Sequence, residues 1–179
     1  MKRIVNILIS MLLIFATLAT FVGCDGFVKR TENEITYYLP GNFDEKNYEG
    51  IQVCYSDLKA SFILTVWGKE ELRKSWNADP YLPYEDNLPE DFDVKNLTDA
   101  FIILNDYEKG AYKYDEARDV TTLFAYATEY YDAEQLDLFY NLLAVTEKYV
   151  YIVTLHCDES YAAEYTELFE DILSRIEIN

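Results

Sequence analysis

The stretch 140-YNLLAVTEKYVYIVTLHC-157 decides the fold, because two apolar runs flank the polar pair Glu147 and Lys148. Two such runs joined by a short turn are typical of a β-hairpin. The first run also fits a helix, since Leu136, Phe139 and Leu143 recur at helical spacing. The sequence therefore leaves open whether residues 136–145 form a strand or a helix.

The segment that follows, residues 160–178, predicts an amphipathic helix. Its apolar side chains form one stripe and its acidic side chains lie opposite. The stripe consists of Tyr161, Tyr165, Leu168, Phe169, Ile172, Leu173 and Ile176, and the opposite side of Glu164, Glu167, Glu170 and Asp171.

Upstream of the hairpin, the pattern predicts strands over residues 34–40, 51–57, 60–68 and 120–132, with a polar loop over 42–50. In 60-ASFILTVWG-68, Phe62 and Leu64 alternate with Ile63 and Trp67. Both sides of that strand are apolar, so we expect both faces of its sheet to be covered.

Two helices are predicted between these strands. Residues 69–76 place Leu72 and Trp76 one turn apart, and residues 96–110 begin at Asn96 as an N-cap and end at Gly110. A long acidic loop over residues 79–95 separates them. The order of elements predicts an α+β fold, in which an antiparallel β-sheet carries helices packed on both faces.

This order resembles the PsbP-like fold, an α/β/α sandwich of photosystem accessory proteins and many small bacterial lipoproteins. The resemblance rests on "ITYYLP", on "ASFILTVWG", and above all on the hairpin followed by "SYAAEYTELFEDILSRIEI". It covers about residues 35–178. It implies a binding or assembly factor, and it supplies no catalytic residue.

Residues 1–23 have the features of a secretory signal. Lys2 and Arg3 precede an uncharged run over residues 4–22. A membrane-spanning helix is the alternative, but Asn6 and Ser10 shorten the apolar part. Residues 24–34 are predicted to be a tether, and residues 35–179 a single globular domain.

The end of this run, Phe21-Val22-Gly23-Cys24, resembles the bacterial lipobox, with Phe21 where Leu is usual. The resemblance implies a diacylglyceryl group on the Cys24 thiol and cleavage just before it. Paired acyl chains hold a protein durably on a membrane. The alternative is a secreted protein cleaved after Ala19. Lipidation predicts an extracytoplasmic, lipid-anchored protein of the cell membrane.

Composition limits the partners of the chain. Removing residues 1–23 from 179 leaves 156, and the loss of Lys2 and Arg3 changes the formal charge from −18 to −20. Such a charge argues against nucleic acid, which is bound through Lys and Arg. It also argues against electrostatic adhesion to anionic lipid. With 17 tyrosines in a half-apolar chain, general disorder is excluded.

Once Cys24 is lipidated, Cys54 and Cys157 are the remaining candidates for a disulfide. A compartment outside the membrane permits the bond. Two buried free thiols are the alternative, and the sequence does not choose between them.

Three further patterns contain residue types that can carry chemistry. His156 and Cys157 are adjacent in a strand, so their side chains point to opposite faces and cannot form a dyad. The stretch 84-YEDNLPEDFD-93 offers oxygen ligands for calcium, but it lacks EF-hand spacing and is interpreted as a solvated loop. Tyrosines near carboxylates, including Tyr81 and Tyr84, suggest a surface for sugars or peptides, although tyrosine is common in strands.

No catalytic residue, metal ligand or cofactor is assigned from these patterns. The expected function is that of a binding or accessory module with a protein or envelope partner. The alternatives are a small carboxylate-dependent hydrolase of the cell envelope and a stabilising subunit of a membrane complex. A hydrolase would require paired carboxylates in a pocket.

Overall fold

The computed structural model describes residues 26–48, 52–79, 87–104, 112–129 and 132–179. Within them, seven antiparallel strands form a sheet in the order β3-β4-β5-β9-β8-β7-β6. These strands are β3 (Asp44–Lys46), β4 (Val53–Ser56), β5 (Ala60–Gly68), β6 (Tyr112–Asp115), β7 (Val120–Glu129), β8 (Asp132–Val145) and β9 (Tyr149–Asp158).

A second sheet, of three strands in the order β1-β2-β10, packs against one face of the seven-stranded sheet. Its strands are β1 (Phe27–Glu32), β2 (Ile35–Pro40) and β10 (Glu177–Ile178). The helices of the described residues are α2 (Lys69–Asn77), α3 (Val94–Leu104), the 3-10 turn η3 (Glu159–Tyr161) and α4 (Ala162–Ser174).

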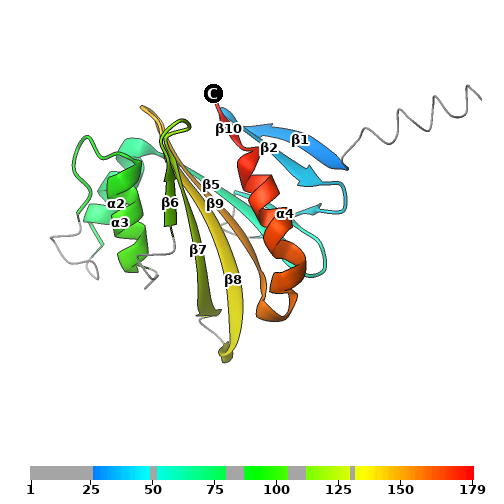
Figure 1. Cartoon of the computed structure of the whole chain (residues 1–179). Helices are drawn as coiled ribbons and strands as arrows, with labels where there is room; N and C mark the ends of the chain where they lie inside the picture. The colour runs from blue at the N-terminus through cyan, green and yellow to red at the C-terminus, as the bar shows by residue number, and fades with distance from the viewer. Residues whose placement is uncertain (1–25, 49–51, 80–86, 105–111, 130–131) are drawn as a thin grey trace, which may run out of the picture.

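The seven-stranded sheet is covered on both faces (Figure 1). Helices α2 and α3 lie on one face, while α4 and the small sheet lie on the other. The predicted α+β class, an antiparallel sheet with helices on both faces, is therefore confirmed. The sequence pattern identified β2 as a strand but did not show that it belongs to a separate sheet.

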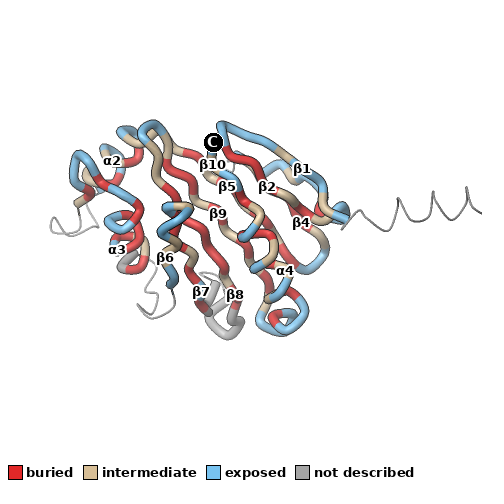
Figure 2. Tube along the Cα trace, turned by 45° about the horizontal axis from the view of Figure 1, so that its top comes forward, coloured by how far each residue is buried: buried red, intermediate tan, exposed pale blue. Residues whose placement is uncertain are grey.

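Buried residues follow the strands of the sheet (Figure 2), and strand alternation divides them between two clusters. On β5, Phe62 and Leu64 face α4, whereas Trp67 packs with the α2 and α3 cluster. On β9, Val153 faces α4 and Val150 faces the other helices. Each Å² of apolar surface that folding removes from water in these clusters stabilises the fold by about 25 cal/mol.

The hairpin predicted around Glu147 and Lys148 is confirmed. Val145 pairs with Val150, and the Thr146 amide donates to the Tyr149 carbonyl at 2.8 Å. Residues 136–145 are strand, because β8 pairs with β7 on one side and with β9 on the other. The backbone groups of this segment are thus used by two neighbouring strands, which a helix could not provide.

Helix α4 follows the hairpin after η3, and its apolar stripe packs on the sheet as predicted. Tyr165, Phe169 and Ile172 are buried in the α4 cluster. The Phe169 ring contacts Tyr140 of β8 edge-on, with centroids 5.8 Å apart.

Three sequence predictions are wrong in part. The proposed tether over residues 24–34 includes β1, which pairs with β2 from Phe27 opposite Pro40 to Glu32 opposite Ile35. The polar side chains of β1 do not alternate with apolar ones, so the sequence does not indicate a strand. Backbone pairing with β2 makes this segment a strand. The predicted loop over residues 42–50 contains β3, which pairs with β4.

The third correction concerns the start of α3. Asn96 was predicted as the N-cap, but the helix begins at Val94. The Asp93 carboxylate accepts from the amides of Lys95 and Asn96, and the Asn96 side chain accepts from the Asp93 amide. This reciprocal arrangement is a capping box, in which Asn96 is the third helical residue. The predicted end of that helix, over residues 105–110, lies outside the described residues.

Candidate functional site

A groove of about 610 Å³ lies between α4 and the strands β6 and β7. Its floor includes Thr122, Phe124 and Tyr140, and its α4 side includes Glu170 and Leu173. It exists because α4 lies over β8 and β9, whereas the sheet continues past the helix to β7 and β6. Helix position and sheet width together leave this part of the α4 face accessible.

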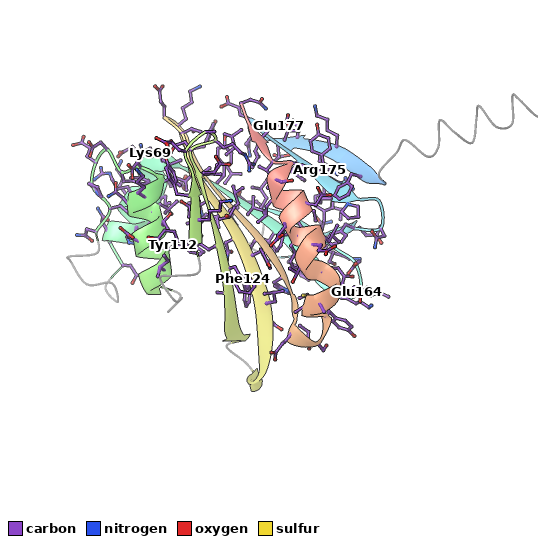
Figure 3. The ribbon with its side chains drawn as sticks, in the orientation of Figure 1. Lys69, Tyr112, Phe124, Glu164, Arg175 and Glu177 are labelled. Atoms are coloured by element: carbon purple, nitrogen blue, oxygen red, sulfur yellow. The ribbon has the colours of Figure 1, made fainter. Side chains whose placement is uncertain are left out.

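Phe124 is the main apolar group of the groove (Figure 3). It is 38% exposed, although its strand β7 is paired with β8 on one side and with β6 on the other. It faces Tyr140 across the β7–β8 pair, with ring centroids 5.0 Å apart at an interplanar angle of 62°. Tyr140 in turn contacts Phe169 of α4. A row of packed rings thus runs from the helix to the groove, which fixes the orientation of Phe124.

Arg118 joins the β6–β7 turn to the end of α4. Its Nη2 donates to the carbonyl oxygens of Leu173 at 3.0 Å and Ile176 at 2.6 Å. The guanidinium also lies 4.0 Å from the Asp115 carboxylate. The last carbonyls of a helix lack partners within the helix and attract cations. Arg118 therefore caps α4 and bounds the groove at the β6–β7 turn.

The groove carries both signs of charge. Lys113 and Arg118 contribute positive groups, while Asp115 and Glu170 contribute negative ones. The register places Lys113 opposite Thr122, on the α4 face, and Tyr112 opposite Leu123, on the α3 face. The arrangement offers the exposed ring of Phe124, aliphatic walls and a polar rim, which suits binding of a partly apolar ligand.

Two carboxyl groups outside the groove have lowered pKa values. A side-chain hydrogen bond with Arg73 lowers the pKa of Glu70, and one with Ser160 lowers the pKa of Asp158. A general acid at neutral pH requires the opposite shift.

The structure does not join the two cysteines that the sequence proposed as a disulfide. Cys54 and Cys157 are buried free thiols. Cys54 is opposite Ile63 and Cys157 is opposite Ala60, which point to opposite faces of β5. A central strand therefore separates the two side chains, and they cannot bond.

The adjacent pair His156 and Cys157 behaves as the strand rule predicts. His156 is opposite Phe139 and Ser61, whereas Cys157 is opposite Leu138 and Ala60. The Cys157 side chain enters the α4 cluster. Burial, together with nearby Asp137, raises the pKa of the Cys157 thiol to about 11. The thiol is therefore protonated at neutral pH and a poor nucleophile.

The acidic stretch 84–93 is only partly described. Asp93 caps α3, and the Asn77 side chain holds the backbone of Leu88 through two hydrogen bonds. In the part of the chain that the structure describes, no group of three or more His, Cys, Asp or Glu side chains is placed to hold a metal. Asp86, Tyr81 and Tyr84 lie outside the described residues.

Several tyrosines belong to the core and not to a binding surface. Tyr37 and Tyr151 are buried, and the Tyr151 hydroxyl donates to the Asn33 carbonyl at 2.7 Å. The sequence suggested a tyrosine-rich surface but did not identify Phe124 or Arg118. Alternation along residues 120–132 places Phe124 on one face, but only the position of α4 shows that this face is left accessible at Phe124.

No helix within the described ranges is both long and apolar enough to cross a membrane.

No family model matches the chain, and no curated protein matches it either. The solved structures that it resembles include the PsbP protein of the cyanobacterium Synechocystis, at 11% identity and a TM-score of 0.46, covering 88% of this chain and 95% of that one. A Bacteroides thetaiotaomicron protein matches at 6% identity and a TM-score of 0.49, covering 82% of this chain and 45% of the other.

The Ran-binding protein Mog1p of Saccharomyces cerevisiae matches at 10% identity and a TM-score of 0.44, covering 85% of this chain and 96% of that one. PsbP-like proteins are the group that the order of elements resembles in the sequence. At these identities the similarity concerns the fold, and no function is taken from it.

Proposed function

We propose that the chain is a lipid-anchored, extracytoplasmic binding module whose ligand site is the groove between α4 and strands β6 and β7. The observation that carries this proposal is the 38% exposed ring of Phe124, held by Tyr140 on the floor of a pocket of about 610 Å³. A pocket of this size, with an apolar floor and a few polar groups, is typical of ligand sites.

The groove favours a ligand with an apolar ring or aliphatic group and a polar backbone. Phe124 would contact the apolar part, while Lys113 and Glu170 at the rim would contact polar groups of either sign. A peptide or a component of the envelope has this character. The balanced charge of the rim argues against a strongly anionic polymer, consistent with the composition of the chain.

Binding is favoured over hydrolysis by the chemistry of the carboxyl groups. Asp115 lies beside Arg118 in the lining of the groove, and Glu170 lies on α4. Hydrogen bonds lower the pKa of Glu70 and of Asp158, and both of these groups lie elsewhere. The groove thus offers contacts, and the acid–base pair of a carboxylate hydrolase has no support from these shifts.

The binding site is tested by site-specific photocrosslinking in intact membranes. Benzoylphenylalanine replaces Phe124 in one variant and Ser75 of α2, an exposed position on the other face, in a matched control. We expect an adduct of defined mass at position 124 that is missing at position 75. The same adducts at both positions, or crosslinks only to the chain itself, would contradict the groove as a binding site.

The anchor is tested separately by mass spectrometry of the native protein. The proposal requires an amino-terminal Cys24 that carries diacylglyceryl, and release of the Cys24→Ser variant from membranes. An unmodified Cys24, or an amino terminus at Thr20, would refute the lipid anchor and leave the groove untouched.

A further inference from the structure

The start of the fold lies close to the proposed lipid anchor. Strand β1 begins at Phe27, and the Gly26 carbonyl accepts from the Gly41 amide at 2.9 Å. If Cys24 is lipidated, as the proposed function holds, only Asp25 separates it from Gly26. Two residues of chain reach about 7 Å at most. The headgroup layer on each side of a bilayer is roughly 5–8 Å thick. The surface around Gly26 must therefore lie at the headgroups.

Strand β1 and helix α4 lie on this same side of the molecule, away from α2 and α3 (Figures 1 and 2). Val28 is the second residue of β1. Its side chain lies against Gly41 and is exposed. Asn42 is joined to the β4–β5 turn by its hydrogen bond to Asp57, and Leu58 at the tip of that turn is wholly exposed. The β4–β5 turn with its exposed leucine is thus connected, through Asn42 and Gly41, to the start of β1.

The β4–β5 turn holds Leu58 in this position. The Asp57 carboxylate accepts from the backbone amides of Lys59 at 2.7 Å and Ala60 at 2.8 Å. Its second oxygen accepts from the Tyr165 hydroxyl at 2.6 Å, which fixes the turn to α4. Because the turn is braced in this way, Leu58 cannot withdraw into the core.

The neighbours of Leu58 have the chemistry of a membrane interface. Lys59 Nζ lies 4.8 Å from the centroid of the Tyr161 ring, and Tyr161 is partly exposed. Lys59 also pairs with Glu164 at 2.8 Å, at the start of α4 (Figure 3). Tyrosine and lysine side chains have an apolar body and a polar end. Such side chains are favoured at the membrane–water interface. The paired charges give this surface no strong attraction to anionic lipid.

We infer that the anchor-side surface, formed by Val28, Leu58, Lys59 and Tyr161, rests on the lipid headgroups with the Leu58 side chain inserted into the bilayer. One inserted leucine is sufficient because the acyl anchor holds the surface at a high effective concentration near the membrane. The domain is therefore docked in one orientation, and does not move freely on a tether of residues 24–34.

The inference is tested with the full-length protein purified from membranes and reconstituted in phosphatidylcholine vesicles. Nitroxide labels are placed on Leu58→Cys, on Val28→Cys, and on Ser75→Cys as the control, and collision with oxygen is compared with collision with a water-soluble nickel chelate. We expect labels at 58 and 28 to favour oxygen and the label at 75 to favour the chelate. Adding Leu58→Ser to the Val28→Cys protein should lower its ratio of docked to undocked molecules by about tenfold or more.

Three outcomes separate this inference from the proposed function. Protein that floats with vesicles and shows oxygen exposure at position 58 supports docking. Protein that floats but shows equal water exposure at positions 58 and 75 overturns docking and leaves the anchor intact. Protein that carries no lipid and does not float overturns the anchor, and with it the docked orientation.

Discussion

Replacement of Arg118 by alanine should destabilise the fold by about 2 kcal/mol. A hydrogen bond to a charged donor contributes about 1.5–3 kcal/mol, and Arg118 makes two to carbonyl oxygens at the end of α4. Its side chain is 31% exposed, so water can replace part of what is lost. The net cost is therefore closer to that of one bond than to the sum of two.

The assay is urea unfolding, followed by the fluorescence of Trp67 and Trp76. In thermal unfolding of a domain of this size, a loss of about 2 kcal/mol corresponds to a fall in melting temperature of roughly 4–8 °C. The slope of the free energy against urea should stay the same, because the amount of surface exposed on unfolding is unchanged.

Arg73→Ala is the matched control. Arg73 is 24% exposed, and its guanidinium pairs with Glu70 on the surface of α2. Ion pairs of that kind contribute little, so the unfolding midpoint of this variant should stay close to that of the wild type. Equal losses in the two variants would refute the claim that capping of α4, and not general surface charge, makes Arg118 stabilising.

Three further predictions concern the core, the thiols and a helix cap. Phe169→Ala removes a wholly buried ring that contacts Tyr140 and should cost about 3–5 kcal/mol in urea unfolding; a loss under about 1 kcal/mol would contradict the packing of α4. Because the pKa of Cys157 is raised from 9.0 to about 11 in the fold, the unfolded chain loses its proton first, and stability should fall between about pH 9 and pH 11. That fall should be smaller in Cys157→Ala, and an unchanged pH profile would count against the burial of the thiol. Asp93→Ala should lower stability by about 1 kcal/mol through loss of the α3 cap, whereas no change in the urea midpoint would show that water satisfies those amides equally well.

The long elements of the fold were predictable because their side chains carry a period. Residues 160–178 place apolar groups at helical spacing, and α4 runs from Ala162 to Ser174. Residues 60–68 alternate with apolar groups on both sides, and β5 has helices on both faces. The spacing of apolar residues matches the structure because successive side chains of a regular helix or strand face the core and the solvent at a fixed period.

The elements that were missed have no such period. β1 is mostly exposed, and its residues are held by backbone hydrogen bonds to β2. β3 is three residues long, with both acidic side chains exposed. Pairing energy of this kind comes from a neighbour elsewhere in the chain, so it leaves no local pattern.

The sequence by itself determined the class of the fold and the amphipathic helix that closes the chain. It did so because hydrophobic burial depends on the spacing of apolar side chains, and this spacing can be recognised within a short stretch of sequence. Only the tertiary structure decided that residues 136–145 are strand, that Cys54 and Cys157 lie on opposite faces, and that Phe124 is left accessible beside α4. Those outcomes depend on which strands become neighbours and on how much of the sheet one helix can cover, and both are set by contacts between distant residues.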